Sequence, residues 1–249
     1  MIELTLLHYI IFFFIVILQT MVGVGVLVLG TPILLILNFE IINIISILLP
    51  VSIFTSFFNL VYFRIVDKIS LNKLGGNIKN YFFTICIPAI IIGLLLLKFF
   101  QNIIDFKIFV ALIIFFSLIL KKYYKNNLVN INVFKKKLLL FIIGLVHGLS
   151  NSGGTLLSIL VLKIYKNSKN ITRYNLTFFY FFLAIMQYLI FIIIFQKLIS
   201  IDLILILLFV VLTGISFGNY FIKFIKKYYF NLLIEILALL SGIFLILTS

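Results

Sequence analysis

Residues 138–162 read LLLFIIGLVHGLSNSGGTLLSILVL, an apolar stretch without Lys, Arg, Asp or Glu that is interrupted by a polar, glycine-rich segment. A helix needs about 20 apolar residues to cross a hydrocarbon core of about 30 Å, so one kinked crossing fits this length. A re-entrant hairpin also fits, because two halves of about 12 residues each reach about 18 Å, roughly to the midplane. In either form the chain bends at HGLSNSGG, residues 147–154, which we call the second break.

Basic residues on both sides of this stretch favour the hairpin. Six lysines lie in residues 121–137 and four basic residues lie in residues 163–173. Positive charge marks cytoplasmic loops, so both flanks are predicted to be cytoplasmic. With the hairpin, 17 of the 20 Lys and Arg residues are cytoplasmic, and Lys98, Lys107 and Lys197 lie on the other side. If every stretch crossed once, the split would be 9 to 11.

The whole chain is as apolar as this stretch. Of its 249 residues, 65% are hydrophobic and 10% are charged, whereas soluble domains have about 45–50% apolar and about 25% charged residues. The short alternating strands of a membrane barrel are absent from the sequence. We therefore predict an all-α integral membrane protein. The other stretches without Lys, Arg, Asp or Glu are Leu4–Phe39, Ile41–Phe63, Asn80–Leu97, Ile108–Leu120, Tyr174–Gln196, Leu203–Ile222 and, apart from Glu235, Tyr228–Ser249.

Charge and cysteine content exclude other classes of partner. The formal net charge of +14 would indicate a nucleic-acid partner in a soluble protein, but in a membrane protein it belongs to cytoplasmic loops, so no nucleic acid is expected. The single cysteine, Cys86, excludes a disulfide framework and a cysteine-based metal site.

A weak internal repeat relates the two halves of the chain. The stretch Leu4–Phe39 also contains helix breakers, around Gly23 and Gly25, which we call the first break. We predict two repeats, residues 1–127 and 128–249, each a broken or re-entrant helix hairpin plus three transmembrane helices. An odd number of crossings inverts the halves, as in secondary transporters. A shift of 128 residues pairs Gln19 with His147, Gly25 with Gly153, Ser56 with Ala184 and Asn59 with Gln187.

The two breaks are predicted to form an anion site. After each break a half-helix begins with unpaired N–H groups and about half a positive charge, and two such ends facing each other bind anions. Alternatively the glycines only permit close helix packing, as expected for Gly214 and Gly218, and the polar side chains only join helices. The predicted substrate-binding residues are Gly23, Gly25, Thr31, Asn59, Ser150, Asn151, Ser152, Gly153, Gly154 and Gln187.

Two titratable residues are candidates for a proton relay. His147 lies in the second break, and its ordinary pKa of about 6.5 suits proton transfer near neutral pH. Glu235 is the carboxylate within a predicted crossing. For both residues a structural role is the alternative: a bond from His147 to a freed carbonyl, and an ion pair of Glu235 with Arg64 or Lys227. No catalytic residue, metal ligand or cofactor is predicted.

The two breaks resemble those of the TauE/SafE family, the sulfite exporter type of small bacterial membrane carriers. QTMVGVGVLVLGTPIL, residues 19–34, is similar to the family's G-x-G followed by proline seven residues on, and GLSNSGG, residues 148–154, resembles its second glycine-rich break. The resemblance covers essentially the whole chain. It implies a carrier of sulfite, sulfonates or other organic anions in the bacterial cytoplasmic membrane, without a cofactor.

Together these patterns predict a secondary transporter that exports a small anion by alternating access. The predicted partners are the anion and the lipid bilayer, with a co-transported proton and a homodimer left open. No buried Arg or Lys is expected at the site. The alternatives are a non-transporting membrane subunit or assembly factor, a cation or metal carrier, and an intramembrane enzyme.

Overall fold

The computed structural model describes residues 4–23, 25–68, 76–123, 132–164, 169–224, 236 and 239–249, and all regular structure within these ranges is helical. Residues 239–247 form the last helical segment. The labelled elements are α1 (Leu6–Val22), α2 (Val26–Ile36), α3 (Ile41–Ile65), α4 (Gly76–Tyr81), the π-helical η2 (Phe82–Cys86), α5 (Ile87–Phe100), α6 (Phe106–Tyr123), α7 (Val133–Ser150), α8 (Gly154–Ile164), α9 (Lys169–Phe195) and α10 (Ile201–Phe221).

The protein is an all-α integral membrane protein. Within the described ranges, four helices are long and apolar enough to cross a membrane: Ile41–Ile65, Ile78–Phe100, Asn170–Phe195 and Ile201–Phe221. Their outer faces carry large apolar side chains, as expected for contact with lipid rather than water. The shorter apolar helices are Leu6–Val22, Val26–Ile36 and Phe106–Leu120.

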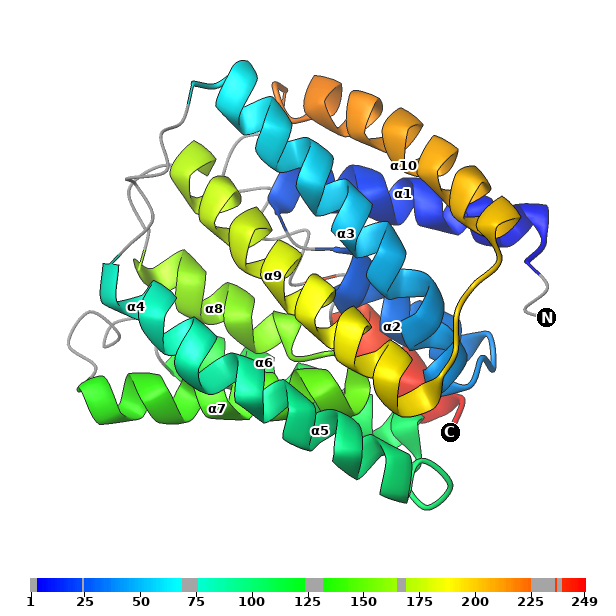
Figure 1. Ribbon diagram of the computed structural model, residues 1–249, viewed down its shortest axis with the longest axis vertical. Coiled ribbons are helices and arrows are strands. Elements are labelled where there is room, and N and C mark those ends of the chain that lie inside the picture. Colours follow the sequence, from blue (N-terminus) through cyan, green and yellow to red (C-terminus); the bar gives the residue numbers. More distant parts are fainter. Residues whose placement is uncertain are drawn as a thin grey trace.

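The two ends of the bundle hold different connections (Figure 1). Residues 37–40, 101–105 and 196–200 lie at one end, which we call the Lys197 end. The starts of α4, α7 and α9 lie at the opposite end, which we call the Arg173 end. The charge count assigns Lys98, Lys107 and Lys197 to one side, and their contacts place all three at the Lys197 end. Lys107 Nζ donates to Asn38 Oδ1 at 2.8 Å, Lys98 Nζ lies 3.5 Å from the Ile194 carbonyl oxygen, and Lys197 bonds Asn43.

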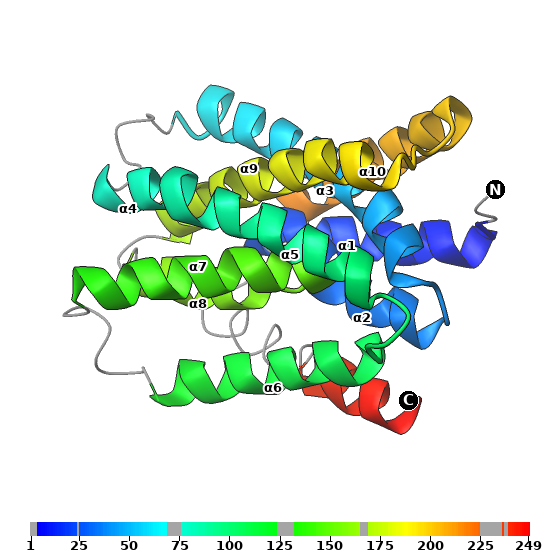
Figure 2. The same cartoon turned by 60° about the horizontal axis from the view of Figure 1, so that its bottom comes forward.

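Both breaks turn the chain back on itself. The helix α1 runs inward from the Lys197 end and α2 returns to it, whereas α7 runs inward from the Arg173 end and α8 returns towards that end (Figures 1 and 2). The two helix pairs are therefore hairpins that enter the bundle from opposite ends. This is the arrangement that an inverted repeat would produce, although the division into residues 1–127 and 128–249 stays a prediction.

Close helix packing holds the hairpins in place. The second hairpin packs on α5, and a methyl group added at Gly148 would lie 2.3 Å from the carbonyl oxygen of Ile90. The first hairpin packs on α10, where a methyl group at Gly214 would lie 2.7 Å from Val16 Cγ1 and one at Gly218 would lie 2.6 Å from Thr20 Cβ. Gly214 and Gly218 thus have the packing role that was expected for them.

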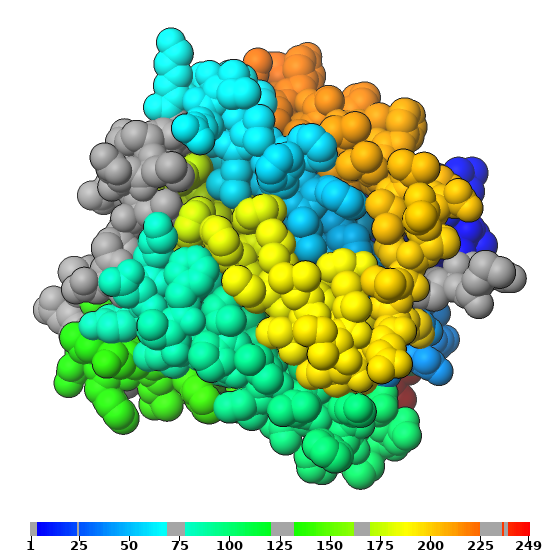
Figure 3. Space-filling view, viewed as in Figure 1, coloured from blue at the N-terminus to red at the C-terminus, as the bar shows by residue number. Residues whose placement is uncertain are grey.

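The long helices cover the two breaks. On the face seen in Figure 3, atoms of α3, α9, α10 and the α4–α5 segment form much of the surface, and part of α7 is also visible. The side chains at the breaks are accordingly buried, with Gln19 1% exposed and His147 and Asn151 both 0% exposed. Polar groups that are held away from both lipid and water in this way need partners, so their hydrogen bonds indicate what each break does.

Candidate functional site

The first break begins where α1 ends in a left-handed residue. Gly23 has φ +80°, and its N–H donates to the carbonyl oxygen of Gln19 at 2.6 Å. Residues with a side chain rarely adopt this conformation, and a methyl group here would also lie 2.9 Å from Leu176 Cβ. Gly25 then precedes the first residue of α2. The glycines therefore allow a sharp reversal next to α9.

Gln19 uses both ends of its amide at the first break. Its Oε1 accepts the Val26 N–H at 2.8 Å, which caps the start of α2, and its Nε2 donates to Ser56 Oγ on α3 at 3.1 Å. Asn59, one turn further along α3, donates from Nδ2 to Thr20 Oγ1 at 3.1 Å. One of the N–H groups that we expected to face an anion is thus used within the hairpin.

Arg173 is a buried cation beside the first break, although the basic residues in 163–173 were predicted to form a cytoplasmic loop. Its side chain is 4% exposed, Nη2 donates to the Thr20 carbonyl oxygen at 2.6 Å, and Cζ lies 4.9 Å from the centre of the Phe63 ring. The predicted extent of this loop was wrong, because α9 begins at Lys169, before the apolar stretch starts. The carbonyl end of α1 and an aromatic face both stabilise a cation here.

The second break is built differently. Ser150 is the last residue of α7, and Asn151 follows with φ +60° and donates its N–H to the His147 carbonyl oxygen at 2.8 Å. Ser150 Oγ lies 2.9 Å from the Val146 carbonyl oxygen and 2.5 Å from Ser152 Oγ. These residues end α7, and Ser150 does not have the N-cap role that its residue type favours.

Several buried polar atoms at the second break have no partner among the described residues. They are Nδ1 and Nε2 of His147, Oδ1 of Asn151 and Oε1 of Gln187. All three side chains are 0% exposed. Two of these residues are joined directly, because Gln187 Nε2 donates to the His147 carbonyl oxygen at 3.0 Å. Unsatisfied buried groups are rare in folded proteins, so a cluster of them is a candidate ligand site.

A contact between the hairpins adds Thr31 to this cluster. Asn151 Nδ2 lies 3.1 Å from Thr31 Oγ1, which is on α2. The structure therefore brings together Thr31, Asn151, His147 and Gln187, whereas Asn59 and the first-break glycines lie at Thr20 and Gln19. The other relay candidate, Glu235, lies outside the described residues.

Protein atoms fill the space beside the second-break glycines. A methyl group on Gly153 would lie 2.4 Å from the Ile143 carbonyl oxygen, and one on Gly154 would lie 2.2 Å from Tyr180 Oη. Tyr180, which is buried and 3.3 Å from Ser158 Oγ, was not among the predicted site residues. Its alignment with polar Ser52 under the 128-residue shift was the signal in the sequence.

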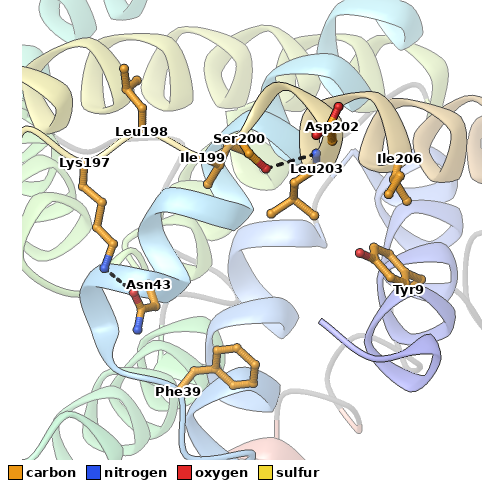
Figure 4. Close-up of a pocket in the computed structure, with 10 residues that line it drawn as sticks. All are labelled: Tyr9, Phe39, Asn43, Lys197, Leu198, Ile199, Ser200, Asp202, Leu203 and Ile206. Carbon is orange, nitrogen blue, oxygen red and sulfur yellow. Dashed lines mark hydrogen bonds between the residues drawn. The ribbon is translucent and has the colours of Figure 1, made fainter. Parts of the chain in front are cut away.

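A cavity of about 670 Å³ opens at the Lys197 end (Figure 4). Lys197 extends from the α9–α10 connection towards Asn43 on α3 and bonds its Oδ1. None of the residues lining the cavity belongs to either break. They are Tyr9, Phe39, Asn43, Lys197, Leu198, Ile199, Ser200, Asp202, Leu203 and Ile206.

Comparison with known proteins identifies a family. A family model described as Sulfite exporter TauE/SafE matches residues 9–245, a span that contains both breaks. Neither a curated protein nor a solved structure matches the chain.

Proposed function

The chain belongs to the sulfite exporter TauE/SafE family, a family of membrane transporters, and we propose that it carries small anions such as sulfite, sulfonates or organic acids. The cytoplasmic membrane of a bacterium is the proposed location. We further propose that the two hairpins belong to inverted repeats and that the substrate binds at the second break. No chemical step is involved, because a carrier only binds and releases its substrate.

The observation that carries this proposal is the cluster of buried polar atoms without partners at the second break. His147 contributes two ring nitrogens, and Asn151 and Gln187 contribute one oxygen each. A neutral imidazole provides one N–H donor, and the start of α8 adds the positive end of a half-helix. An anion bound there would accept hydrogen bonds from the imidazole N–H and from the start of α8, without a buried salt bridge.

Alternating access requires contacts that open at one end while those at the other stay closed. Contacts at both ends join the first half of the chain to the second, and we single out one at each end. At the Arg173 end, Arg173 on α9 holds the Thr20 carbonyl oxygen of α1, and at the Lys197 end, Lys197 holds Asn43 on α3. We propose that each contact separates when the site opens towards its end.

The membrane potential sets the direction for an uncoupled carrier. A monoanion that leaves a cell with a negative interior gains about 2.3 kcal/mol per 100 mV, so export needs no coupling ion. Uptake against this potential would need a co-transported proton or a steep gradient. His147 is the described residue that would carry such a proton, because its imidazole lies within the site.

Anion flux into proteoliposomes at a set membrane potential tests the proposal. The informative variant is Asn151→Gly, because glycine keeps the left-handed conformation at φ +60° and removes the amide. Asn38→Gly is the matched control, since Asn38 has φ +61° but lies exposed at the Lys197 end. We expect potential-driven flux of sulfite or a sulfonate, reduced at least tenfold by Asn151→Gly and unchanged by Asn38→Gly.

The contrary result is equally clear. If folded protein carries none of sulfite, sulfoacetate or a non-sulfur organic anion at either polarity, the chain is not an anion carrier. If anions are carried and both glycine variants behave alike, the substrate does not use Asn151, and the site lies elsewhere in the bundle.

A further inference from the structure

Gln187 offers a buried acceptor in the proposed anion site. Its Nε2 lies 3.0 Å from the His147 carbonyl oxygen, which can only accept a hydrogen bond, so this contact fixes which amide atom is which. The remaining atom, Oε1, is therefore an acceptor, and it has no partner among the described residues. An anion without hydrogen-bond donors would leave this oxygen unsatisfied and close to negative charge.

The His147 imidazole has the same requirement. When it is neutral, one ring nitrogen donates and the other accepts, and neither has a partner among the described residues. Asn151 adds a further buried amide atom without a partner, although the Thr31 hydroxyl, 3.1 Å from Nδ2, can pair with either end of the amide. The site thus holds one donor and one acceptor on a neutral imidazole and a further acceptor on Gln187.

We propose that the second break selects monoanions that also carry a hydroxyl group. The charged oxygen of such an ion accepts the imidazole N–H of His147, and its hydroxyl donates to Gln187 Oε1. Hydrogensulfite and hydroxyalkyl sulfonates meet both requirements, whereas sulfate, sulfoacetate and simple alkanesulfonates have no hydroxyl donor at neutral pH. This inference rests on the proposed function and narrows its substrate class.

The physical basis is the cost of an unsatisfied buried acceptor. A site that is built to hydrogen-bond a substrate hydroxyl rejects an analogue that lacks it, because the protein atom then loses its partner without regaining water. The discrimination is larger than that from shape alone, since exchange of a hydroxyl for a methyl group hardly changes size. Matched pairs of anions therefore separate this inference from simple charge selection.

The experiment measures proteoliposome flux for two pairs of monoanions in mildly acidic buffer, where sulfite is mostly singly protonated. One pair is 2-hydroxyethanesulfonate and propane-1-sulfonate, which exchange a hydroxyl for a methyl group. The other is hydrogensulfite and chlorate, which share a pyramidal shape and a single charge. In each pair that is carried, we expect the hydroxyl-bearing ion to be preferred on the order of tenfold or more.

A variant then assigns the preference to Gln187. Gln187→Met keeps the size of the side chain and removes the amide, so the preference is expected to fall towards one. Gln101→Met is the matched control, because Gln101 Nε2 also donates to a carbonyl oxygen, that of Lys98 at 3.3 Å, but does so at the Lys197 end. It should leave the preference as in the wild type. If Gln187→Met does not fold, the wild-type fluxes within the two anion pairs still test the hydroxyl requirement.

Two results would overturn the inference in different ways. Equal wild-type flux within every carried pair rejects the hydroxyl requirement and leaves anion transport standing. Absence of flux for all four ions from folded protein rejects the proposed function, and the inference with it. A preference that persists in folded Gln187→Met rejects Gln187 as its source.

Discussion

The two breaks have the same architecture but differ in how their polar groups are satisfied. At the first break, Gln19 uses both ends of its amide, one for the start of α2 and one for α3. At the second, His147 uses neither of its ring nitrogens within the described residues. The side-chain amide that pairs within the first hairpin thus contrasts with the unpartnered imidazole at the second, where we propose that the substrate binds.

The 128-residue shift makes this comparison specific, because it pairs Gln19 with His147 and Asn59 with Gln187. In both halves the residue on the long helix reaches the carbonyl end of the preceding half-helix: Asn59 bonds Thr20, and Gln187 bonds His147. The paired positions thus make similar contacts in different surroundings. Substitution of the paired residues should therefore separate stability from transport.

His147→Leu is expected to have the largest effect, and on transport alone. Leucine fills a similar volume and removes two ring nitrogens that have no protein partner, so the folded state loses no hydrogen bond from the side chain. We expect anion flux to fall about 100-fold, equivalent to about 2.7 kcal/mol, while the thermal unfolding temperature in detergent stays the same or rises.

The other histidine in the chain provides the control. His8 lies near the start of α1, where its Nδ1 accepts the Thr5 N–H at 2.9 Å, far from either break. His8→Leu should leave flux within about twofold of the wild type. A loss of stability in His147→Leu without a specific loss of flux would place His147 in a structural role instead.

Gln19→Leu should show the opposite behaviour. The Val26 N–H and Ser56 Oγ both lose their partner, and Val26 is buried. We expect the free energy of unfolding to fall by about 2 kcal/mol, as for loss of a helix cap in a buried setting. Flux per folded molecule should change much less than in His147→Leu. If it falls as far, the first break also contacts the substrate.

Arg173→Met tests the buried cation beside the first break. The variant loses the charged hydrogen bond to the Thr20 carbonyl and the contact with the Phe63 ring, but it also removes the cost of burying a charge. A net loss of about 1 kcal/mol in unfolding free energy is expected, with partial recovery in Arg173→Lys. An increase in stability would mean that Arg173 is retained for transport rather than for folding.

Composition and helix breakers were enough to predict the class of fold and the positions of both breaks. Gly23 and the segment around Asn151 do end α1 and α7, because few residue types reverse a helix inside a membrane. The role of Arg173 was not predictable in this way. Its partners, Thr20 and Phe63, are distant in the sequence, and a basic residue at the edge of an apolar stretch has the pattern of a loop.

The difference between satisfied and unsatisfied atoms could not be predicted from the sequence either. Gln19, Asn59, Asn151 and Gln187 are all amides on predicted membrane segments, and their residue types are equally suited to join helices or to bind a ligand. Only three-dimensional packing decides whether each amide atom meets another side chain. Thr31 likewise joins the second-break cluster only through its contact with Asn151, which lies 120 residues away in the sequence and in the other hairpin.

Asn59→Leu is expected to have the smallest effect and tests the comparison most sensitively. Asn59 combines both behaviours, because its Nδ2 is bonded to Thr20 Oγ1 while its Oδ1 is buried without a partner among the described residues. Loss of one hydrogen bond between membrane helices costs about 0.6 kcal/mol, which corresponds to about threefold. We expect anion flux to fall about threefold and the free energy of unfolding to fall by about 0.6 kcal/mol. Proteoliposome flux and unfolding in detergent measure the two changes. A drop in flux near 100-fold with intact stability would extend the substrate site from the second break to the first, because the unpartnered oxygen would then be a ligand contact like that of Gln187.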